Sequence, residues 1–314
     1  MSTTDQGWVD YWQQDGDSGE VFVNSKGERH PTLAKYWTAV FEGTADASRI
    51  IDIASGAGSI YAHLPSDHGL NLFAADIAEE ALETLKARIP GVTTVACPAE
   101  AVPYGDGYFN LVVSQFGVEY AGTDAFTEAG RLVAVGGRLA ALCHVEDGYI
   151  DSSNKIQLEE ARLVDEMRFI DLAIDLTRVA FSNDANAMQQ SEAVFVPVMR
   201  KLAAGVERCP RGIHSHLFRG FGQLFEQRRA YDATDITTWL EQMRADLDKN
   251  IDRLSRMRAA ALSKADMTTI AENLTAAGLQ EIQFNLFTTP GNELPVAWKL
   301  SARRPAERDP ESRR

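Results

Sequence analysis

The 314-residue sequence contains little cysteine and no long apolar run. Its three cysteines, Cys97, Cys143 and Cys209, are odd in number and far apart, which indicates a reducing compartment rather than a disulfide framework. No apolar stretch approaches the roughly 18 residues that a membrane-spanning helix needs. The polar residues 1–6 do not have the pattern of a signal peptide. We therefore expect a cytoplasmic protein without a membrane partner.

Positive charge is scarce as well. Lys and Arg number 31 against 45 Asp and Glu, which gives a net charge of −14 and a pI near 4.9. Nucleic-acid binding depends on a basic face that neutralises phosphates, so we expect no nucleic-acid partner. The composition, 45% hydrophobic and 24% charged, is typical of a globular protein that can bury a full core.

Residues 49–64 contain the most informative local pattern. Ile50 and Ile51 start a β-branched run, Gly56 and Gly58 mark a turn, and apolar residues resume after it. This order predicts a strand, a tight loop and a helix. Glycine lets the backbone approach a ligand closely, so the loop predicts a nucleotide-type pocket. A dinucleotide-binding loop would have a third small residue where Tyr61 stands, which counts against an NAD site.

Strands and helices alternate on both sides of this loop. We predict strands at 71–75, 92–97, 109–116 and 138–144, and helices at 78–88 and 124–133. A Gly136-Gly137 turn precedes the last of these strands. The alternation then stops, and helices are predicted at 156–181, 184–207, 213–231 and 236–262. A helix at 266–276 and an antiparallel hairpin of residues 281–287 and 295–300 close the pattern.

These elements suggest five segments. Residues 1–47 form an N-terminal helical cap, in which Leu33, Tyr36, Trp37, Val40 and Phe41 share one helical face. Residues 48–148 form the ligand-binding core, and 149–262 form a helical insertion that serves as a substrate lid. Residues 263–304 return to the core, and 305–314 form a disordered tail.

The core resembles a known family at several places. Residues Asp52-Ile53-Ala54-Ser55-Gly56-Ala57-Gly58 resemble motif I of the class I S-adenosylmethionine-dependent methyltransferases, Asp-x-Gly-x-Gly-x-Gly, with Ala54 for the first glycine. Asp76 stands where the family places an acid for the ribose hydroxyls of its cofactor. Residues 97–104 resemble the adenine-lining segment Asp-Ala-Glu-x-Leu-Pro-Phe, with Pro98 for the aspartate. Residues 106–113 and 129–139 resemble two further family segments, Asp-x-Ser-Phe-Asp-x-Val and Arg-Val-Leu-Lys-Pro-Gly-Gly-x-Leu.

The resemblance implies an α/β fold with a Rossmann-like core. Its sheet would be mostly parallel and seven-stranded with one antiparallel strand, and a helical cap and a lid insertion would be added to it. The implied cofactor is S-adenosylmethionine, with S-adenosylhomocysteine as its product. The residues that this resemblance assigns to the cofactor are Asp52, Ala54, Ser55, Gly56, Gly58, Asp76, Ile77, Ala99, Glu100, Ser114, Gln115 and Phe116.

Catalytic candidates lie just beyond the predicted strands. His144, at the carboxyl end of the fifth strand, is the candidate general base, because open α/β sheets bind ligands at that edge. Glu119 and Tyr120, past the fourth strand, could orient an acceptor. The aromatic residues Tyr11, Trp12, Phe22 and Trp37 could form a wall over a cationic group. No metal is expected: His214 and His216 would point about 200° apart on a helix and could not chelate one ion.

The sequence therefore predicts an enzyme that methylates a small-molecule substrate. The acceptor atom, whether N, O, S or C, is left open, and so is a homodimer. One alternative is a protein that binds S-adenosylmethionine as a regulator without transferring methyl. Another is an NAD-dependent oxidoreductase, which Tyr61 disfavours.

Overall fold

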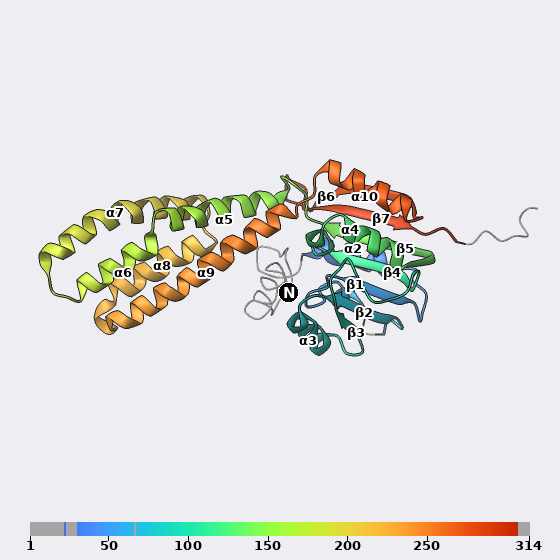
Figure 1. Ribbon diagram of the computed structural model, residues 1–314, viewed down its shortest axis with the longest axis horizontal. Coiled ribbons are helices and arrows are strands. Elements are labelled where there is room, and N and C mark those ends of the chain that lie inside the picture. The colour runs from blue at the N-terminus through green and yellow to red at the C-terminus, as the bar shows by residue number, and fades with distance from the viewer. Residues whose placement is uncertain (1–21, 23–29, 66, 307–314) are drawn as a thin grey trace, which may run out of the picture. The chain divides into compact units, whose positions relative to one another are not determined.

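The computed structural model describes residues 22, 30–65 and 67–306 (Figure 1). The chain forms two compact units: a core made of residues up to 151 and from 260 onward, and a helical unit of residues 152–259. The aromatic residues Trp8, Tyr11 and Trp12 and most of the predicted tail lie outside the described residues. Within the described part of the chain, no helix is both long and apolar enough to cross a bilayer.

The core contains one seven-stranded sheet in the order β3-β2-β1-β4-β5-β7-β6. Its strands are β1 Arg49–Ile53, β2 Asn71–Asp76, β3 Thr93–Ala96, β4 Phe109–Gln115, β5 Val133–Cys143, β6 Gln280–Phe287 and β7 Ala297–Arg303. The pairs among β1 to β5 are parallel, whereas β7 runs antiparallel to both β5 and β6. The predicted fold class, including the single antiparallel strand and the terminal hairpin, is therefore confirmed.

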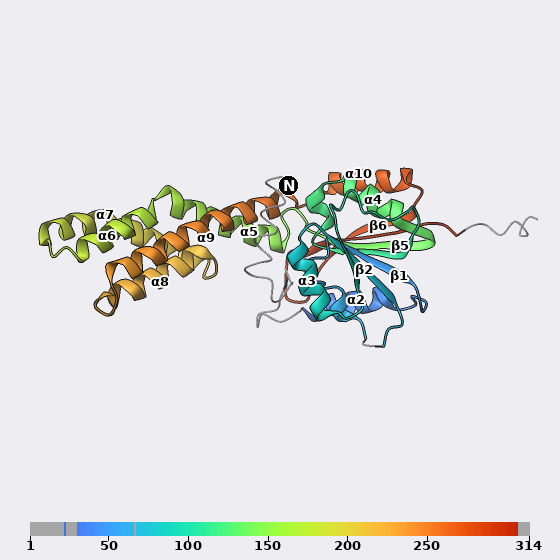
Figure 2. The ribbon, with the colours of Figure 1, turned by 60° about the horizontal axis from the view of Figure 1, so that its bottom comes forward.

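Helices cover both faces of this sheet. In Figure 2, α4 (Asp124–Leu132) and α10 (Lys264–Ala276) lie on one side, and α2 (Pro31–Phe41) lies on the other. The first face packs Ile51, Ile53 and Val112 against Phe126 and Ile270 in one continuous buried cluster. On α2 the predicted apolar face is confirmed, because Leu33, Trp37 and Phe41 are buried. A capping box of Ser263 and Asp266 begins α10.

The helix expected directly after the Gly-containing loop is not formed. Only a single 3₁₀ turn, η1 (Tyr61–His63), follows the loop, and α3 (Glu79–Arg88) is the first full helix beyond it. The Tyr61 hydroxyl donates to the carbonyl of Phe73 and to that of Ile50, which ties the chain to β1 and β2. Pro65 follows Leu64 and disfavours helical backbone there. The prediction of a helix directly after the loop was therefore wrong.

Strand β5 is longer than predicted. It begins at Val133, and its pairing with β4 shifts between Phe109 and Leu111, which face Val133 and Arg138 respectively. The Gly136-Gly137 pair, predicted as a turn before the strand, thus lies inside an irregular section of it. Glycine is favoured here because Gly136 has φ of +75° and a side chain on Gly137 would collide with backbone oxygens.

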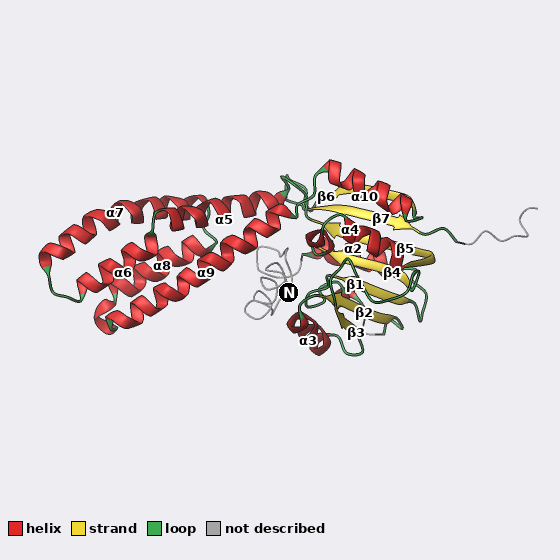
Figure 3. Cartoon of the chain, in the orientation of Figure 1, coloured by secondary structure: helices red, strands yellow, loops and turns green. Residues whose placement is uncertain are grey.

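The helical unit is built from five helices, α5 Tyr149–Glu166, α6 Phe169–Ala180, α7 Ala185–Arg208, α8 Ile213–Glu226 and α9 Ala233–Ala259 (Figure 3). Helix α5 begins in the core, before residue 152. The single helix predicted over 156–181 was wrong, because Arg168 adopts left-handed backbone with φ of +53° and separates α5 from α6. Pro197 lies inside α7. Phe169, Leu217 and Leu240 are among the residues of a separate apolar core in this unit.

Candidate active site

The loop after β1 is held by the carboxylate of Asp76 at the end of β2. Its Oδ2 accepts the backbone N–H of Gly56 at 2.8 Å, and its Oδ1 accepts that of Ala78 at 2.9 Å. The N–H of Ser55 donates to the carbonyl of Ala75 at 3.1 Å. Each carboxylate oxygen can accept more than one hydrogen bond, so Asp76 keeps capacity for a ligand. The loop and Asp76 thus form one preorganised edge.

Asp52 is the second buried carboxylate at this edge. Burial, together with the nearby charge of Asp76, raises the pKa of Asp52 well above its ordinary value. Its Oδ1 is buried and has no hydrogen-bond partner among the described residues. Burial also raises the pKa of Asp76, although the N–H groups that it accepts oppose the shift. A buried acceptor without a donor is costly, so a positively charged or N–H-bearing ligand would relieve it.

A close backbone contact links the loop to the end of β4. Ala54 has left-handed backbone with φ of +53°, and its carbonyl oxygen would lie 2.5 Å from a Cβ placed on Gly117. Position 117 therefore requires glycine, because a side chain there would collide with Ala54. This requirement was not predicted from the sequence. The position of Gly117 directly after a predicted strand end was the available signal. This contact sets the distance between the loop and the segment that carries Glu119.

Ser114 and Gln115, at the end of β4, make hydrogen bonds to different parts of the core. The Ser114 hydroxyl donates to the carbonyl of Ile53 at 2.8 Å and accepts the N–H of Val118 at 3.1 Å, so it joins β1 to β4. The Gln115 amide donates to the Ser59 hydroxyl at 3.1 Å and accepts the indole N–H of Trp37 at 2.5 Å. Helix α2 is thereby tied to the loop through Gln115.

The adenine-lining segment proposed from sequence follows β3. The N–H of Cys97 donates to the carbonyl of Asp76 at 2.9 Å, which places the start of this segment beside the loop. Burial and the charge of Asp76 raise the pKa of the Cys97 thiol to about 11, which keeps it protonated at neutral pH. Ala99 and Ile77 are half-buried, and Glu100 is exposed.

Glu119 and His144 form a buried pair at the carboxyl ends of β4 and β5. The Oε1 of Glu119 accepts the backbone N–H of His144 at 2.7 Å and lies 2.8 Å from its Nδ1. The side chains are 0% and 1% exposed respectively. With Glu119 ionised, this geometry puts the imidazole proton on Nδ1 and leaves a lone pair on Nε2. Nε2 has no hydrogen-bond partner in the part of the chain that the structure describes.

Aromatic rings enclose the histidine. The Phe116 ring lies 4.7 Å from the imidazole, centroid to centroid, and the Tyr120 ring lies 5.6 Å away. Phe116 itself has φ of +51°, which turns the chain sharply at the end of β4. All three catalytic candidates from the sequence therefore come together. Phe22 contacts Tyr149, and Trp37 is fully buried and donates to Gln115. An aromatic wall over a cationic group stays a prediction.

Part of the core is similar in sequence to a known protein family. Residues 51–141 match the family described as a methyltransferase domain. The matched segment runs from β1 through most of β5, so it contains the loop, Asp76 and Glu119. The family expected from the sequence is thus confirmed for this part of the chain.

Curated proteins that are similar to part of this chain are also methyltransferases. A demethylmenaquinone methyltransferase from Beutenbergia cavernae is 30% identical over 99 residues, which are 31% of this chain and 41% of that protein. The ubiquinone/menaquinone biosynthesis C-methyltransferase UbiE from Cupriavidus taiwanensis is 31% identical over 118 residues, 35% of this chain and 49% of that protein. The chain therefore spans less than half the length of these relatives.

Among solved structures, a putative S-adenosyl-L-methionine-dependent methyltransferase from Methanococcus maripaludis aligns over 97% of this chain and 93% of its own. The sequence identity is 12% and the TM-score is 0.44. A likeness at this level does not establish a shared architecture. The fold assignment rests on the strand order of the sheet itself.

Proposed function

We propose that this chain, whose residues 51–141 belong to the methyltransferase-domain family, transfers a methyl group from S-adenosylmethionine to a small molecule. The observation that carries the proposal is the edge formed by Asp52, Asp76 and the loop 54–58, next to a buried Glu119–His144 pair. The first part suits a cofactor that bears both hydroxyls and positive charge. The second part suits an acceptor that must lose a proton.

The residues of the edge fit S-adenosylmethionine in chemical type. Its ribose offers two hydroxyl donors, which match the remaining acceptor capacity of the Asp76 carboxylate. Its amino group and sulfonium are cationic, and the unpartnered Oδ1 of Asp52 is a buried acceptor that such a charge would satisfy. The Ser114 hydroxyl is already bonded at both ends, so we assign it to the scaffold. Ile77, Ala99, Glu100 and Phe116 remain proposed contacts.

When bound, S-adenosylmethionine supplies an electrophilic methyl group. The chain's contribution is to hold the acceptor in line with that methyl and to exclude water, which is where much of the acceleration of such a displacement arises. We assign the proton to the lone pair of His144 Nε2. Glu119 is a positioning residue, because its Oε1 fixes both the backbone and Nδ1 of His144. Tyr120 borders the same ring and helps to orient the acceptor.

The relatives indicate which acceptor to test first. One is named a demethylmenaquinone methyltransferase and another a quinone-pathway C-methyltransferase. Reduced quinones and other phenols would arrive protonated, which is the case in which a buried histidine base is useful. We further propose that residues 149–262 form a lid and select the acceptor. Substitutions in that segment should then change KM for the acceptor and not the affinity for the cofactor.

Several expectations from the sequence are part of this proposal. The acidic composition still favours a small-molecule substrate over nucleic acid. A cytoplasmic location rests on the sparse, unpaired cysteines. A homodimer is a separate question, for which the helical unit offers a surface.

The proposal is tested by incubating the full chain with methyl-labelled S-adenosylmethionine and a panel of reduced quinones, phenols, amines and thiols. Formation of S-adenosylhomocysteine with a labelled product, lost in His144→Gln, supports methyl transfer. Tight binding of S-adenosylmethionine without turnover on any acceptor would favour the regulator instead. Selective binding of NAD would favour the oxidoreductase.

A further inference from the structure

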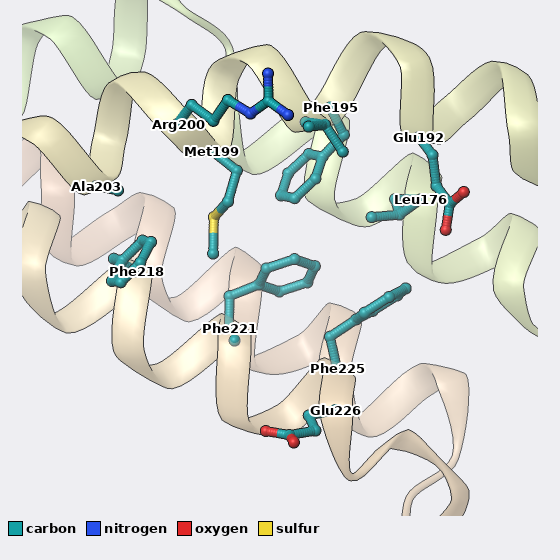
Figure 4. A pocket seen from close by; sticks show the side chains of 12 residues that line it. Leu176, Glu192, Phe195, Met199, Arg200, Ala203, Phe218, Phe221, Phe225 and Glu226 are labelled. Carbon is teal, nitrogen blue, oxygen red and sulfur yellow. The ribbon is translucent and has the colours of Figure 1, made fainter.

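The helical unit contains an open apolar groove between α7 and α8 (Figure 4). Its volume is about 470 Å³, and its lining includes Phe195, Met199, Phe218, Phe221 and Phe225. Gly222 adds no side chain to the lining, and the nearest atom to a Cβ placed there is Met199 Cε at 3.9 Å. Aromatic residues and methionine are enriched at protein–protein interfaces, so the groove has the composition of a docking surface.

One edge of this groove is formed by a single face of α7. Glu192, Val196 and Arg200 line it at intervals of four residues, so they lie one turn apart along the helix. Val196 is 41% exposed, which is high for an apolar side chain that borders an apolar groove. In Figure 4 the Glu192 and Arg200 side chains extend from α7 on either side of the groove-lining phenylalanine Phe195.

Glu192 and Arg200 have no ion-pair partner within the described residues. Nearby charges are paired differently: Arg208, at the end of the same helix, binds Glu160 on α5. The two free charges are opposite in sign and lie eight residues apart, or about 12 Å along the helix axis at ~1.5 Å per residue. Val196 lies midway between them.

This arrangement is complementary to itself. A two-fold axis perpendicular to α7 at Val196 places Glu192 opposite Arg200 of the partner subunit, and the reverse pair follows by symmetry. The two α7 helices would then run antiparallel, with each Val196 side chain packed into the other copy's groove. A hydrocarbon ligand or an unrelated helix would fill the same groove but would give no role to this spacing of charges.

We propose that two copies of this chain associate through the α7–α8 groove about a two-fold axis at Val196. The interface consists of a central apolar contact and two symmetric Glu192–Arg200 ion pairs at its ends. Apolar burial supplies most of the affinity, and the charge pairs fix the antiparallel register. The proposal does not depend on the methyl acceptor or on the cofactor.

A charge-swap experiment on the full chain tests this interface. Sedimentation equilibrium would compare wild type, Glu192→Arg, Arg200→Glu and the double variant that exchanges both charges. Each single change sets like charges against each other twice, so we expect the dimer dissociation constant to rise about 10- to 100-fold. The double variant restores opposite charges and should return to within about threefold of wild type.

Glu159→Arg is the matched control. Glu159 is exposed on α5 and does not line the groove, so its reversal changes net charge by the same amount without affecting the dimer. Far-ultraviolet circular dichroism should show unchanged helix content in every variant. A wild type that stays monomeric at a protein concentration of about 100 μM would overturn the proposal. Binding of dodecanol, a hydrocarbon probe, in the groove of a monomeric wild type would overturn it as well. So would a dimer that ignores the single reversals, or a double variant that stays dissociated.

Discussion

One oxygen of Glu119 holds two parts of His144: its Oε1 accepts the histidine's backbone N–H at 2.7 Å and lies 2.8 Å from the ring's Nδ1. The double contact fixes both the end of β5 and the orientation of the imidazole. Both side chains are buried, so the carboxylate acts in a medium where water screens it little. The remaining nitrogen, Nε2, is thereby available as a proton acceptor in a fixed position.

This pair predicts different effects for its two members. His144→Gln should lower kcat by about 100- to 10,000-fold, the usual contribution of a general base, with little change in S-adenosylmethionine affinity. Glu119→Gln should lower kcat less, because the amide oxygen can still accept the backbone N–H of His144 but the charge that faces Nδ1 is lost. Initial rates at saturating cofactor and acceptor measure both effects.

Glu119→Asp is the conservative comparison for that measurement. It keeps the negative charge and should therefore retain more of the wild-type kcat than Glu119→Gln does, at unchanged affinity for S-adenosylmethionine. Equal losses of kcat in the two variants, or losses that only follow lower stability, would contradict the assigned role.

Asp52 should make the free protein less stable as pH rises. Its folded-state pKa is raised by burial and by Asp76, so folding favours the protonated form. The stabilisation is complete below the unfolded-state value of about 4 and is lost as pH increases through the folded-state value. In Asp52→Asn this loss is absent. We expect its Tm to match wild type near pH 4 and to exceed it by several degrees at pH 8, with weaker cofactor binding.

Thermal unfolding at a series of pH values checks this expectation. The relevant quantity is the difference in Tm between variant and wild type, because it cancels the other titrating groups. A difference that stays constant with pH, or that falls as pH rises, would contradict the raised pKa of the buried Asp52 carboxyl.

Gly117 should be intolerant of a methyl group. Its Cβ would lie 2.5 Å from the Ala54 carbonyl oxygen and 2.8 Å from the Ala54 Cβ, so the loop must move. Gly117→Ala should cost about 1–3 kcal/mol of unfolding free energy, as overpacking does, and should weaken S-adenosylmethionine binding. Urea unfolding and calorimetry would measure the two losses.

Gly105→Ala is a suitable control for Gly117→Ala. Nothing lies within 4 Å of a Cβ placed on Gly105, and its backbone is outside the left-handed region. It should leave stability and binding near wild type. Equal losses in both variants would show that the contact between Gly117 and Ala54 has no special importance.

The regular parts of the fold were predictable because their signals are local. The β-branched runs at β1 and β2 and the spacing of Leu33, Trp37 and Phe41 on α2 each lie within a few turns or one strand. The missing helix after the loop depends on a hydrogen bond from Tyr61 to Phe73, twelve residues away. The break at Arg168 depends on left-handed backbone at a residue type that gives no warning of it.

In the candidate active site, too, local features were predictable from the sequence and long-range contacts were not. Glu119 and His144 could each be proposed, because each lies just past a predicted strand. Their contact could not, because it joins residues 25 apart in sequence across neighbouring strands. Gly117 was missed because its importance comes from the carbonyl of Ala54, which the sequence does not place beside it.

Calorimetric titration with S-adenosylmethionine and with S-adenosylhomocysteine tests the central claim most directly. We expect micromolar binding by wild type, about −8 kcal/mol. Asp76→Asn should bind about 10- to 150-fold more weakly, because hydrogen bonds to a charged group are lost. Glu79→Gln, an exposed change at the start of α3, should bind like wild type. Binding of neither ligand, or equal binding by Asp76→Asn and wild type, would contradict the account.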